Sequence, residues 1–215
     1  MTQSSPVVSS LAPLAKPEVI VFDLGKVLVD FDYGLAARKF AQTSKLPLPE
    51  IHQIITKPEI LFRYETGHLT RKQFYDAICA ATGYCGPLEV FGEFFSDIFT
   101  PIPEMIDLHA ELRANGFATF IFSNTNDLAI QHIRKNFPFF ANFDGYILSY
   151  EHGSMKPDRH LYEVVEKITG RKGSKILYLD DRQENIEAGQ ARQWQTVLQE
   201  NPAKTRAALK KLGLV

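Results

Sequence analysis

Polar residues follow four apolar segments of the chain. They are Asp23 in VIVFDLGKVLVD, Ser123 and Asn124 in FIFSNTND, Lys156 in GSMKPD, and Asp180 and Asp181 in ILYLDDRQENIEAG. Carboxylates can act as nucleophiles or bind a hard cation, and hydroxyl, amide and ammonium groups can hold an anion. The residue types are therefore those of a site that binds and attacks an anionic group.

Each of these residues has an ordinary structural explanation when it is taken alone. A lone Asp after a strand is commonly a turn residue, and Ser-Asn at a helix start is commonly an N-cap. Asp-Asp before a helix can complement the helix dipole, and a Lys before a Pro is commonly a solvated surface residue. Chance is a poor explanation for all four features in this order, because together they would supply a nucleophile, a phosphate cradle and a divalent-metal site.

The apolar runs predict strands that are buried on both faces. They span Val19–Phe22, Ala118–Phe122, Tyr146–Leu148, Ile176–Leu179 and, with a weaker pattern, Thr196–Leu198. Helical periodicity lies between them, at Pro103–Asn115, Asn126–Lys135, Pro157–Thr169 and Gln183–Arg192. Because strands and helices alternate, the predicted fold class is α/β with a doubly wound parallel sheet. Ligands bind beyond the carboxyl ends of the strands in such sheets, which is where the polar residues fall.

Residues 33–99 interrupt this alternation, because they carry helical periodicity and no convincing strand. Within them, Thr70-Arg71-Lys72-Gln73 has the form of a capping box and predicts a helix start at Thr70. We therefore expect an all-helical insertion at 33–99, an α/β core formed by 18–32 and 100–215, and a flexible tail at 1–17, which is rich in Ser, Pro and Ala.

The composition is that of an ordinary globular protein. A net charge of −1 and a charged fraction of 23% give no strong field of either sign, so a nucleic-acid partner is not expected. No apolar run approaches the roughly 20 residues of a membrane helix, and the N-terminus lacks the pattern of a secretion signal. The two cysteines, Cys79 and Cys85, have neither zinc nor redox spacing. We expect a cytoplasmic protein with reduced thiols; the sequence leaves monomer and homodimer open.

On these motifs the sequence resembles the haloacid dehalogenase (HAD) superfamily, over residues 18 to about 197. The first-motif nucleophile, second-motif hydroxyl, third-motif lysine and fourth-motif acids match Asp23, Ser123, Lys156, and Asp180 with Asp181. The amino-acid sequences of these motifs most resemble those of the bacterial α-D-glucose-1-phosphate phosphatase-like subgroup. The resemblance implies a Rossmann-like core, and the inserted helices resemble the helical (C1) cap of the family.

The resemblance further implies a Mg²⁺-dependent phosphomonoester hydrolase acting on a small phosphorylated metabolite, such as a sugar phosphate. Asp23 would attack phosphorus and form an aspartyl phosphate that water hydrolyses, with Lys156 as the second catalytic residue. The implied Mg²⁺ ligands are oxygens of Asp23, Gly25, Asp181 and, directly or through water, Asp180. The implied phosphate-binding residues are Leu24, Ser123, Asn124 and Lys156.

The sequence departs from the family pattern two positions after the nucleophile. Most phosphatases of the superfamily have a second Asp there, as general acid and base, whereas this chain has Gly25 followed by Lys26. Loss of a general acid costs roughly 10² to 10⁴ in rate, against total accelerations of about 10⁶ to 10²¹. We expect a slowed reaction that favours leaving groups stable as anions, such as an anomeric oxygen or a phenol, unless water, Asp30 or a cap residue supplies the proton.

Several other residues have candidate roles. Asp30 and Asp32 are expected to pack and cap near the link to the insertion, and Trp194 is expected in the core. Four residues of the polar segment around YETGHLT could face a substrate: Arg63, Tyr64, Glu65 and His68. The six histidines have no ligand spacing, so a zinc site is not supported.

Two alternative functions remain open. A haloacid dehalogenase also uses an Asp nucleophile but needs no divalent metal, and the presence of both Asp180 and Asp181 argues against it. A non-catalytic protein that binds a phosphate ligand would explain Gly25, whereas Asp23, Lys156 and Asp181 argue for turnover. A phosphomutase is less favoured still, because it too relies on the acid that Gly25 replaces.

Overall fold

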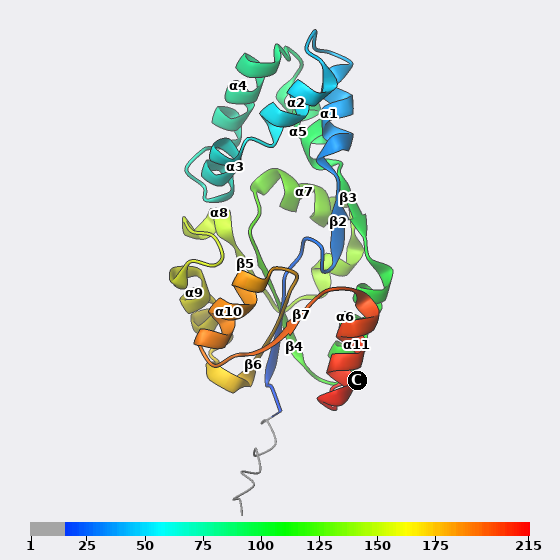
Figure 1. The fold of residues 1–215 in the computed structure, drawn as a ribbon, viewed down its shortest axis with the longest axis vertical. Coiled ribbons are helices and arrows are strands. Elements are labelled where there is room, and N and C mark those ends of the chain that lie inside the picture. Colours follow the sequence, from blue (N-terminus) through cyan, green and yellow to red (C-terminus); the bar gives the residue numbers. More distant parts are fainter. Residues whose placement is uncertain (1–15) are drawn as a thin grey trace, which may run out of the picture.

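The computed structural model describes residues 16–215 (Figure 1), so the expected tail at 1–17 lies almost wholly outside the described residues. The lower part of the molecule contains a parallel sheet of five strands in the order β5–β4–β1–β6–β7. The strands are β1 (Val19–Phe22), β4 (Ala118–Ser123), β5 (Gly145–Leu148), β6 (Ile176–Asp180) and β7 (Gln195–Leu198). The chain proceeds outward from β1 on one side and then on the other, which confirms the doubly wound α/β fold.

Helices cover both faces of this sheet. The alternating residues of β1 divide between two hydrophobic clusters, with Ile20 and Phe22 on one side and Val19 and Val21 on the other. The first cluster takes apolar residues from α6 (Pro103–Ala114), α7 (Asp127–Asn136) and α11 (Pro202–Lys211), and the second from α9 (Arg159–Thr169) and α10 (Gln183–Ala191). Burial on both faces explains why the strands read as unbroken apolar runs.

The predicted elements agree with the observed ones within about two residues at their ends, with some additions. Four observed elements were not predicted, namely α11 and the short elements α8 (Ser149–His152), η1 (Pro138–Asn142) and η2 (Gly173–Lys175). A start signal for α11 was present, because Asn201 caps the backbone N–H of Lys204 and Pro202 occupies the first turn. Trp194 is buried in the second cluster, as expected, and Cys79 and Cys85 are free thiols.

Residues 33–96 form five helices in the upper part of Figure 1. These are α1 (Tyr33–Ala41), α2 (Leu48–Ile55), α3 (Pro58–Glu65), α4 (Arg71–Thr82) and α5 (Leu88–Ser96). They enclose a third hydrophobic cluster that is rich in aromatic rings, including Phe40, Phe74, Phe91 and Phe95. The capping box at the start of α4 is confirmed, since Thr70 N donates to Gln73 Oε1 at 2.9 Å and Gln73 N donates to Thr70 Oγ1 at 3.3 Å.

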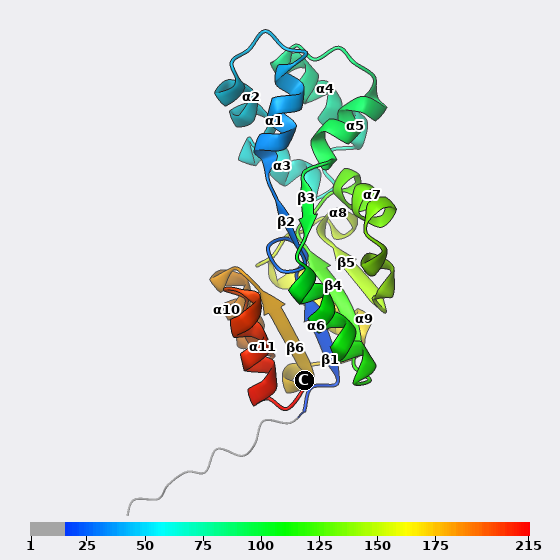
Figure 2. The ribbon, with the colours of Figure 1, turned by 90° about the vertical axis from the view of Figure 1, so that its right-hand side faces the viewer.

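A two-stranded antiparallel ribbon joins the helical part to the sheet (Figure 2). It consists of β2 (Val29–Phe31) and β3 (Phe99–Pro101), which were not predicted. Phe99 lay in the range expected to be helical, but it begins β3 because it pairs with Phe31. Asp32 then caps α1 by accepting a hydrogen bond from Gly34 N at 2.7 Å, in agreement with its expected role.

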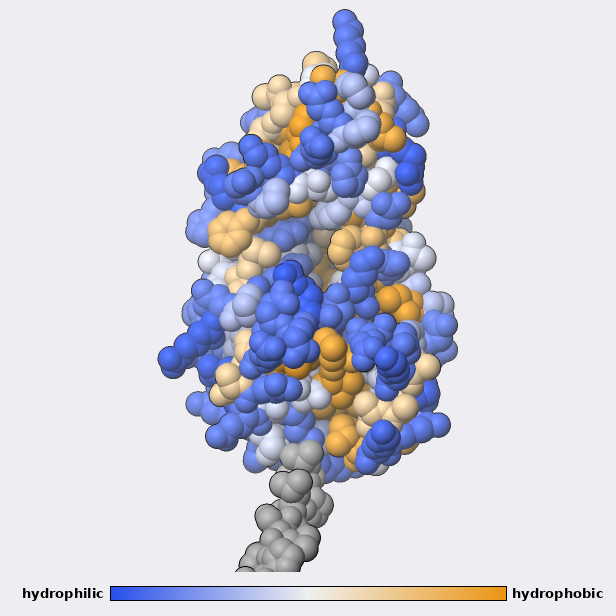
Figure 3. Space-filling view, in the orientation of Figure 1, coloured by the Kyte–Doolittle hydropathy of each residue, from blue (hydrophilic) through white to orange (hydrophobic). Residues whose placement is uncertain are grey.

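The surface in Figure 3 is mainly hydrophilic, with hydrophobic residues in scattered patches over both parts of the molecule. Helices that could traverse a lipid bilayer, long and apolar enough to do so, are not found between residues 16 and 215.

The turn between α3 and α4 lies against the backbone of α8. Gly67 has a φ of +69°, and a Cβ atom at this position would lie 2.3 Å from the carbonyl oxygen of Tyr150. Only glycine permits both the left-handed conformation and this close approach. The contact fixes one edge of the helical part directly above a helix that follows β5.

Replacing Gly67 by Ala should therefore destabilise the protein more than the same change at Gly83. Gly83 also has a positive φ, +75°, but nothing lies within 4 Å of its would-be Cβ. Gly83→Ala should lower the free energy of unfolding by about 1–2 kcal/mol, because alanine disfavours the left-handed conformation. Gly67→Ala should lower it further, because the new methyl group also clashes with the Tyr150 backbone. Urea unfolding of the two variants measures the difference. Equal losses would show that the turn does not rest on α8 in solution.

Candidate active site

The carboxyl ends of three neighbouring strands bring the predicted residues to one edge of the sheet. Phe22 of β1 is in register with Ile121 of β4 and Leu179 of β6. Asp23 and Asp180 directly follow the paired residues and emerge at the same level, and Ser123 lies one position further along β4. Lys156 joins them from the segment between α8 and α9. All four are buried, with side chains from distant parts of the chain meeting at one place.

The ammonium group of Lys156 lies at the centre of this cluster. Its Nζ is 2.9 Å from Asp23 Oδ1 and 2.7 Å from Asp180 Oδ2, and it donates to the backbone carbonyl of Phe122 at 2.9 Å. A lysine has three N–H donors, and all three have acceptors here. Burial alone would lower the pKa of Lys156, but Asp23 and Asp180 outweigh it and hold the pKa above its ordinary value. The side chain is therefore a fixed positive charge.

Asp180 has a full complement of hydrogen-bond donors. Lys156 and the hydroxyl of Tyr178 donate to its Oδ2, while Arg182 N at 2.8 Å and Asn185 Nδ2 at 3.0 Å donate to its Oδ1. Burial favours the neutral form, but Lys156 and the other donors prevail and lower the pKa of Asp180. Because its lone pairs are occupied, Asp180 is better suited to orient Lys156 than to bind a metal directly.

Asp23 and Asp181 are less completely neutralised. Burial raises the pKa of Asp23 to about 7, with Lys156 opposing the shift and the charge of Asp180 adding to it. Burial and the charge of Asp180 also raise the pKa of Asp181. Three carboxylates thus share one ammonium group in a poorly solvated site, and a cation bound there would relieve the excess negative charge.

The donor set fits a hard divalent cation. Asp23, Asp180 and Asp181 each offer an oxygen, and these oxygens lie within 4.8 Å of one another. Within residues 16–215 the Gly25 carbonyl accepts no hydrogen bond, and Asn185 Oδ1 is a buried oxygen without a partner. A metal-bound water would satisfy the latter. All-oxygen coordination of this kind suits Mg²⁺.

The residues expected to hold phosphate differ in their availability. Ser123 Oγ makes only a long hydrogen bond, 3.4 Å to the Asn124 carbonyl, and can turn to an incoming anion. The Asn124 side chain brackets the Lys156 backbone, with Lys156 N donating to Oδ1 at 2.7 Å and Nδ2 donating to the Lys156 carbonyl at 3.1 Å. Leu24 N donates to Asp23 Oδ1 at 2.6 Å. Asn124 thus positions Lys156 and keeps one N–H for a ligand.

The position of the missing acid is occupied by an aromatic ring. A Cβ atom on Gly25 would lie 3.0 Å from Phe31 Cε1, so a larger residue would require Phe31 to move. Lys26 extends toward the ribbon, where it pairs with Asp30 and lies over the Phe31 ring, 4.7 Å from the centroid. Its charge is thus engaged away from Lys156.

Two of the four candidate residues of the helical part are at least partly withdrawn from solvent. The Tyr64 hydroxyl donates to Asp127 Oδ1, and Glu65 is partly buried, whereas Arg63 and His68 are exposed. Arg71 Nε donates to Asp127 Oδ2 at 2.8 Å. Asp127, in the first turn of α7, therefore receives two donors from the helical part.

Sequence reasoning missed Tyr178, Asn185 and Asp127 as supporting residues. Tyr178 precedes Asp180 by two residues and so shares its face of β6, which is a signal that was available. Asn185 lies in the same motif and is buried, but the sequence does not indicate which residue its side chain contacts. Asp127 belongs to the segment FIFSNTND, and its partners are more than 50 residues away in the sequence.

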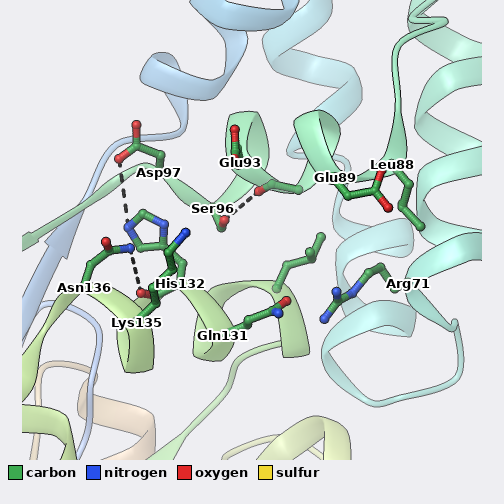
Figure 4. A pocket seen from close by; sticks show the side chains of 12 residues that line it. Arg71, Leu88, Glu89, Glu93, Ser96, Asp97, Gln131, His132, Lys135 and Asn136 are labelled. Carbon is green, nitrogen blue, oxygen red and sulfur yellow. Dashed lines mark hydrogen bonds and ion pairs between the residues drawn. The ribbon is translucent and has the colours of Figure 1, made fainter.

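A separate cavity of about 490 Å³ lies between α5 and α7 (Figure 4). Its walls carry charges of both signs, including Arg71, Glu93 and Lys135, but none of the predicted site residues. The cluster around Asp23 is instead nearly closed, with Asp23 7% and Lys156 5% exposed. Ser96 and His132 line the cavity, but Ser96 Oγ donates to the Gly92 carbonyl at 2.6 Å and makes no hydrogen bond with His132 in the part of the chain that the structure describes. The cavity therefore holds no activated nucleophile, and the candidate site is the cluster of side chains around Asp23.

The hydroxyl of Tyr178 should contribute more stability than that of Tyr162. Both rings belong to the same buried cluster, but Tyr178 donates to the Asp180 carboxylate and Tyr162 to the neutral Asn185 carbonyl, at 2.9 Å. Tyr178→Phe should cost about 1.5–3 kcal/mol at pH 7 and Tyr162→Phe about 0.5–1.5 kcal/mol. Urea unfolding provides the comparison; a reversed order would contradict this picture of Asp180.

Comparison with known proteins agrees with this geometry. Residues 17–191 match the family model of haloacid dehalogenase-like hydrolases. A D-ribitol-5-phosphate phosphatase of Bacteroides thetaiotaomicron is 26% identical over 88% of this chain and 95% of its own. A sesquiterpene phosphatase of Aspergillus oryzae is 25% identical over 80% of this chain and 84% of its own.

A HAD family enzyme of Bacteroides thetaiotaomicron, crystallised with magnesium and inorganic phosphate, has the same fold. Its TM-score is 0.75 at 23% identity, covering 85% of this chain and 93% of that one. Since the family model covers most of the sequence and the motif residues converge as the fold requires, the chain belongs to the haloacid dehalogenase-like hydrolase family.

Proposed function

We propose that the protein is a Mg²⁺-dependent phosphomonoester hydrolase that acts on a small phosphorylated metabolite through an aspartyl-phosphate intermediate. The observation that carries the proposal is the Lys156 ammonium group held between Asp23 and Asp180, with Asp181 in the same cluster. A buried nucleophile beside a fixed positive charge suits attack on a phosphoryl group, whose negative charge must be balanced as it transfers.

Each residue of the site has a separate role in the proposed reaction. Asp23 forms the bond to phosphorus, Lys156 balances the charge on the phosphoryl oxygens, and Ser123 with one Asn124 N–H donates to those oxygens. Asp180 holds Lys156 in its orientation. Asp23, Asp181 and the Gly25 carbonyl would bind Mg²⁺, whereas Asp180, whose lone pairs are occupied, would add its negative charge beside the ion. Mg²⁺ would supply charge neutralisation at the phosphoryl oxygens.

The similar proteins support the class of reaction and the metal. Two are named as phosphatases, and another was crystallised with magnesium and inorganic phosphate. In this proposal residues 33–99 are the cap that encloses the substrate, and 18–32 with 100–215 are the catalytic core. A sugar phosphate is the proposed substrate, since the motifs resemble those of the sugar-phosphate phosphatases.

Asp23→Asn should abolish phosphate release. The folded parent protein should release phosphate from p-nitrophenyl phosphate or from a member of a sugar-phosphate panel when Mg²⁺ is present, and EDTA should stop the reaction. Asp30→Asn is the matched control, because Asp30 is exposed and paired with Lys26, and this variant should keep the parent activity.

Other outcomes identify the alternatives. Release of halide from 2-haloacids without metal would indicate a dehalogenase. Phosphate binding with no turnover of any substrate by the folded parent would indicate a non-catalytic binding protein. Either result would overturn the proposed phosphatase activity.

Mg²⁺ should stabilise the protein more at pH 8 than at pH 6. Burial raises the pKa of Asp23 to about 7, so protons compete with the metal below that pH. Because this folded-state pKa exceeds the unfolded value, the metal-free protein should gain stability as pH falls from about 7 toward 4, while the metal contribution diminishes. Thermal midpoints with saturating Mg²⁺ or EDTA at both pH values measure the effect; Asp181→Asn should weaken it. A larger shift at pH 6 would contradict the proposed ligand set.

A further inference from the structure

The proposed reaction needs a proton donor that the end of β1 does not supply. Gly25 has no side chain, and Phe31 occupies the space beside it. Asp30 is not suited to the task, because its hydrogen bond from Lys26 lowers its pKa and keeps it ionised. A side chain that serves as the acid must therefore come from another element; otherwise water has to supply the proton.

The end of α3 is attached to the site edge by three contacts. The Glu65 carbonyl accepts a hydrogen bond from Ser149 Oγ at 2.6 Å, and the same hydroxyl accepts one from Thr125 N at 2.8 Å. The neighbouring Tyr64 donates to Asp127, and Gly67 rests on the Tyr150 backbone. One hydroxyl group thus separates the backbone of Glu65 from the loop that begins with Ser123 and Asn124. Figure 1 displays α3 and its following turn above α8.

The carboxyl group of Glu65 has no structural partner. It makes no hydrogen bond or ion pair with any residue from 16 to 215, although it is partly buried. Its oxygens are not fully enclosed, so the carboxyl is partly buried and still accessible to water or a ligand. Neither packing nor pairing explains a glutamate here, since ionisation in partly buried surroundings without a partner carries a cost. Burial raises the pKa of Glu65 to about 7, which is the range suited to a general acid and base near neutral pH.

Two aromatic rings extend from the vacant acid position toward the inserted helices. The Phe31 ring adjoins Gly25, and the ring of Tyr33 is 5.9 Å from that of Phe31 between centroids. Burial raises the pKa of the Tyr33 hydroxyl, and the negative charge of Glu65 raises it further. The charge of Glu65 thus acts on Tyr33, whose ring is next to the ring that adjoins Gly25.

We propose that Glu65 is the general acid and base of the reaction, in place of the residue missing at position 25. The inference rests on the proposed phosphatase function. As Asp23 bonds to phosphorus and the bond to the ester oxygen breaks, the Glu65 carboxyl gives its proton to that oxygen and the alcohol departs. The Glu65 carboxylate then takes a proton from water as the water oxygen bonds to phosphorus. Inorganic phosphate leaves, Asp23 is regenerated, and Glu65 is again protonated.

The alternative role for Glu65 is to bind a substrate hydroxyl. The two roles differ in their dependence on the leaving group. A proton donor is needed most by a simple alkyl phosphate, whose alkoxide leaves poorly, and least by p-nitrophenyl phosphate, whose phenolate leaves readily. A hydroxyl-binding residue would instead change KM for substrates that carry hydroxyl groups, whatever the leaving group.

The test compares Glu65→Gln with the parent full-length protein in Mg²⁺, using p-nitrophenyl phosphate and ethyl phosphate, neither of which carries a free hydroxyl beyond the phosphate. We expect kcat/KM for ethyl phosphate to fall by roughly 10² to 10⁴, and that for p-nitrophenyl phosphate to fall much less. Glu59→Gln is the matched control, because Glu59 is an exposed glutamate of the same helix and should behave as the parent.

Equal losses for the two substrates, or no loss, would overturn the role of Glu65. A folded parent that turns over neither substrate nor any sugar phosphate would overturn the phosphatase function itself, and the two failures are therefore distinguishable. The thermal midpoint of Glu65→Gln should equal or exceed that of the parent, because an unpaired carboxylate is removed. If the Gln variant unfolds, Glu65→Asp takes its place, because it keeps an acid on a side chain one methylene shorter and should retain part of the activity on ethyl phosphate. A folded Glu65→Ala variant offers a further check. If it kept the parent's ratio of kcat/KM for ethyl phosphate to that for p-nitrophenyl phosphate, the proposal would also be overturned.

Discussion

The buried ammonium group of Lys156 is the interaction on which the site depends. An ammonium group without counter-charges could not remain ionised at this depth, and two carboxylates without it would repel each other. Breaking a buried pair of this kind typically costs about 3–5 kcal/mol, because the remaining charge has no partner. The same contact joins the end of β1, the end of β6 and the segment before α9. Stability and chemistry are therefore inseparable at this point.

The parallel sheet makes this contact possible. Adjacent strands in register deliver Asp23 and Asp180 to the same edge, and the crossover connections leave that edge open for the loop carrying Lys156. Tyr178 and Asn185 then saturate Asp180, and Asn124 fixes the backbone of Lys156. These polar contacts restrict each functional group to one orientation. Preorganisation of this kind is what electrostatic catalysis requires.

The inserted helices complete an environment that the sheet alone lacks. Their hydrophobic cluster also includes Leu128 of α7, and the end of α3 is attached to the sheet edge through Asp127, Ser149 and the Tyr150 backbone. The ribbon of β2 and β3 carries Phe31 into the space beside Gly25. The proposed role of Glu65 would connect two features, the absence of an acid at Gly25 and a carboxyl on the inserted part that has no partner among residues 16–215.

The sequence by itself determined the class of fold and the identity of the residues at the sheet edge. Continuous apolar runs predict strands buried on both faces, and the polar residue after each run predicts its place at the carboxyl edge, because both follow from local patterns. The capping box at Thr70 was predictable for the same reason. The ribbon strands were not, since three-residue strands such as Val29–Phe31 carry too short a period to detect.

Only the tertiary structure decided how these residues divide their roles. That Asn124 holds the Lys156 backbone, that Asp180 has no free lone pair, and that Lys26 pairs with Asp30 depend on directions and distances between segments remote in sequence. The same holds for Glu65, which was one polar residue among four in its segment. Its partial burial, and the absence of a partner for its carboxyl among residues 16–215, depend on the packing of segments remote in sequence, which no local pattern encodes.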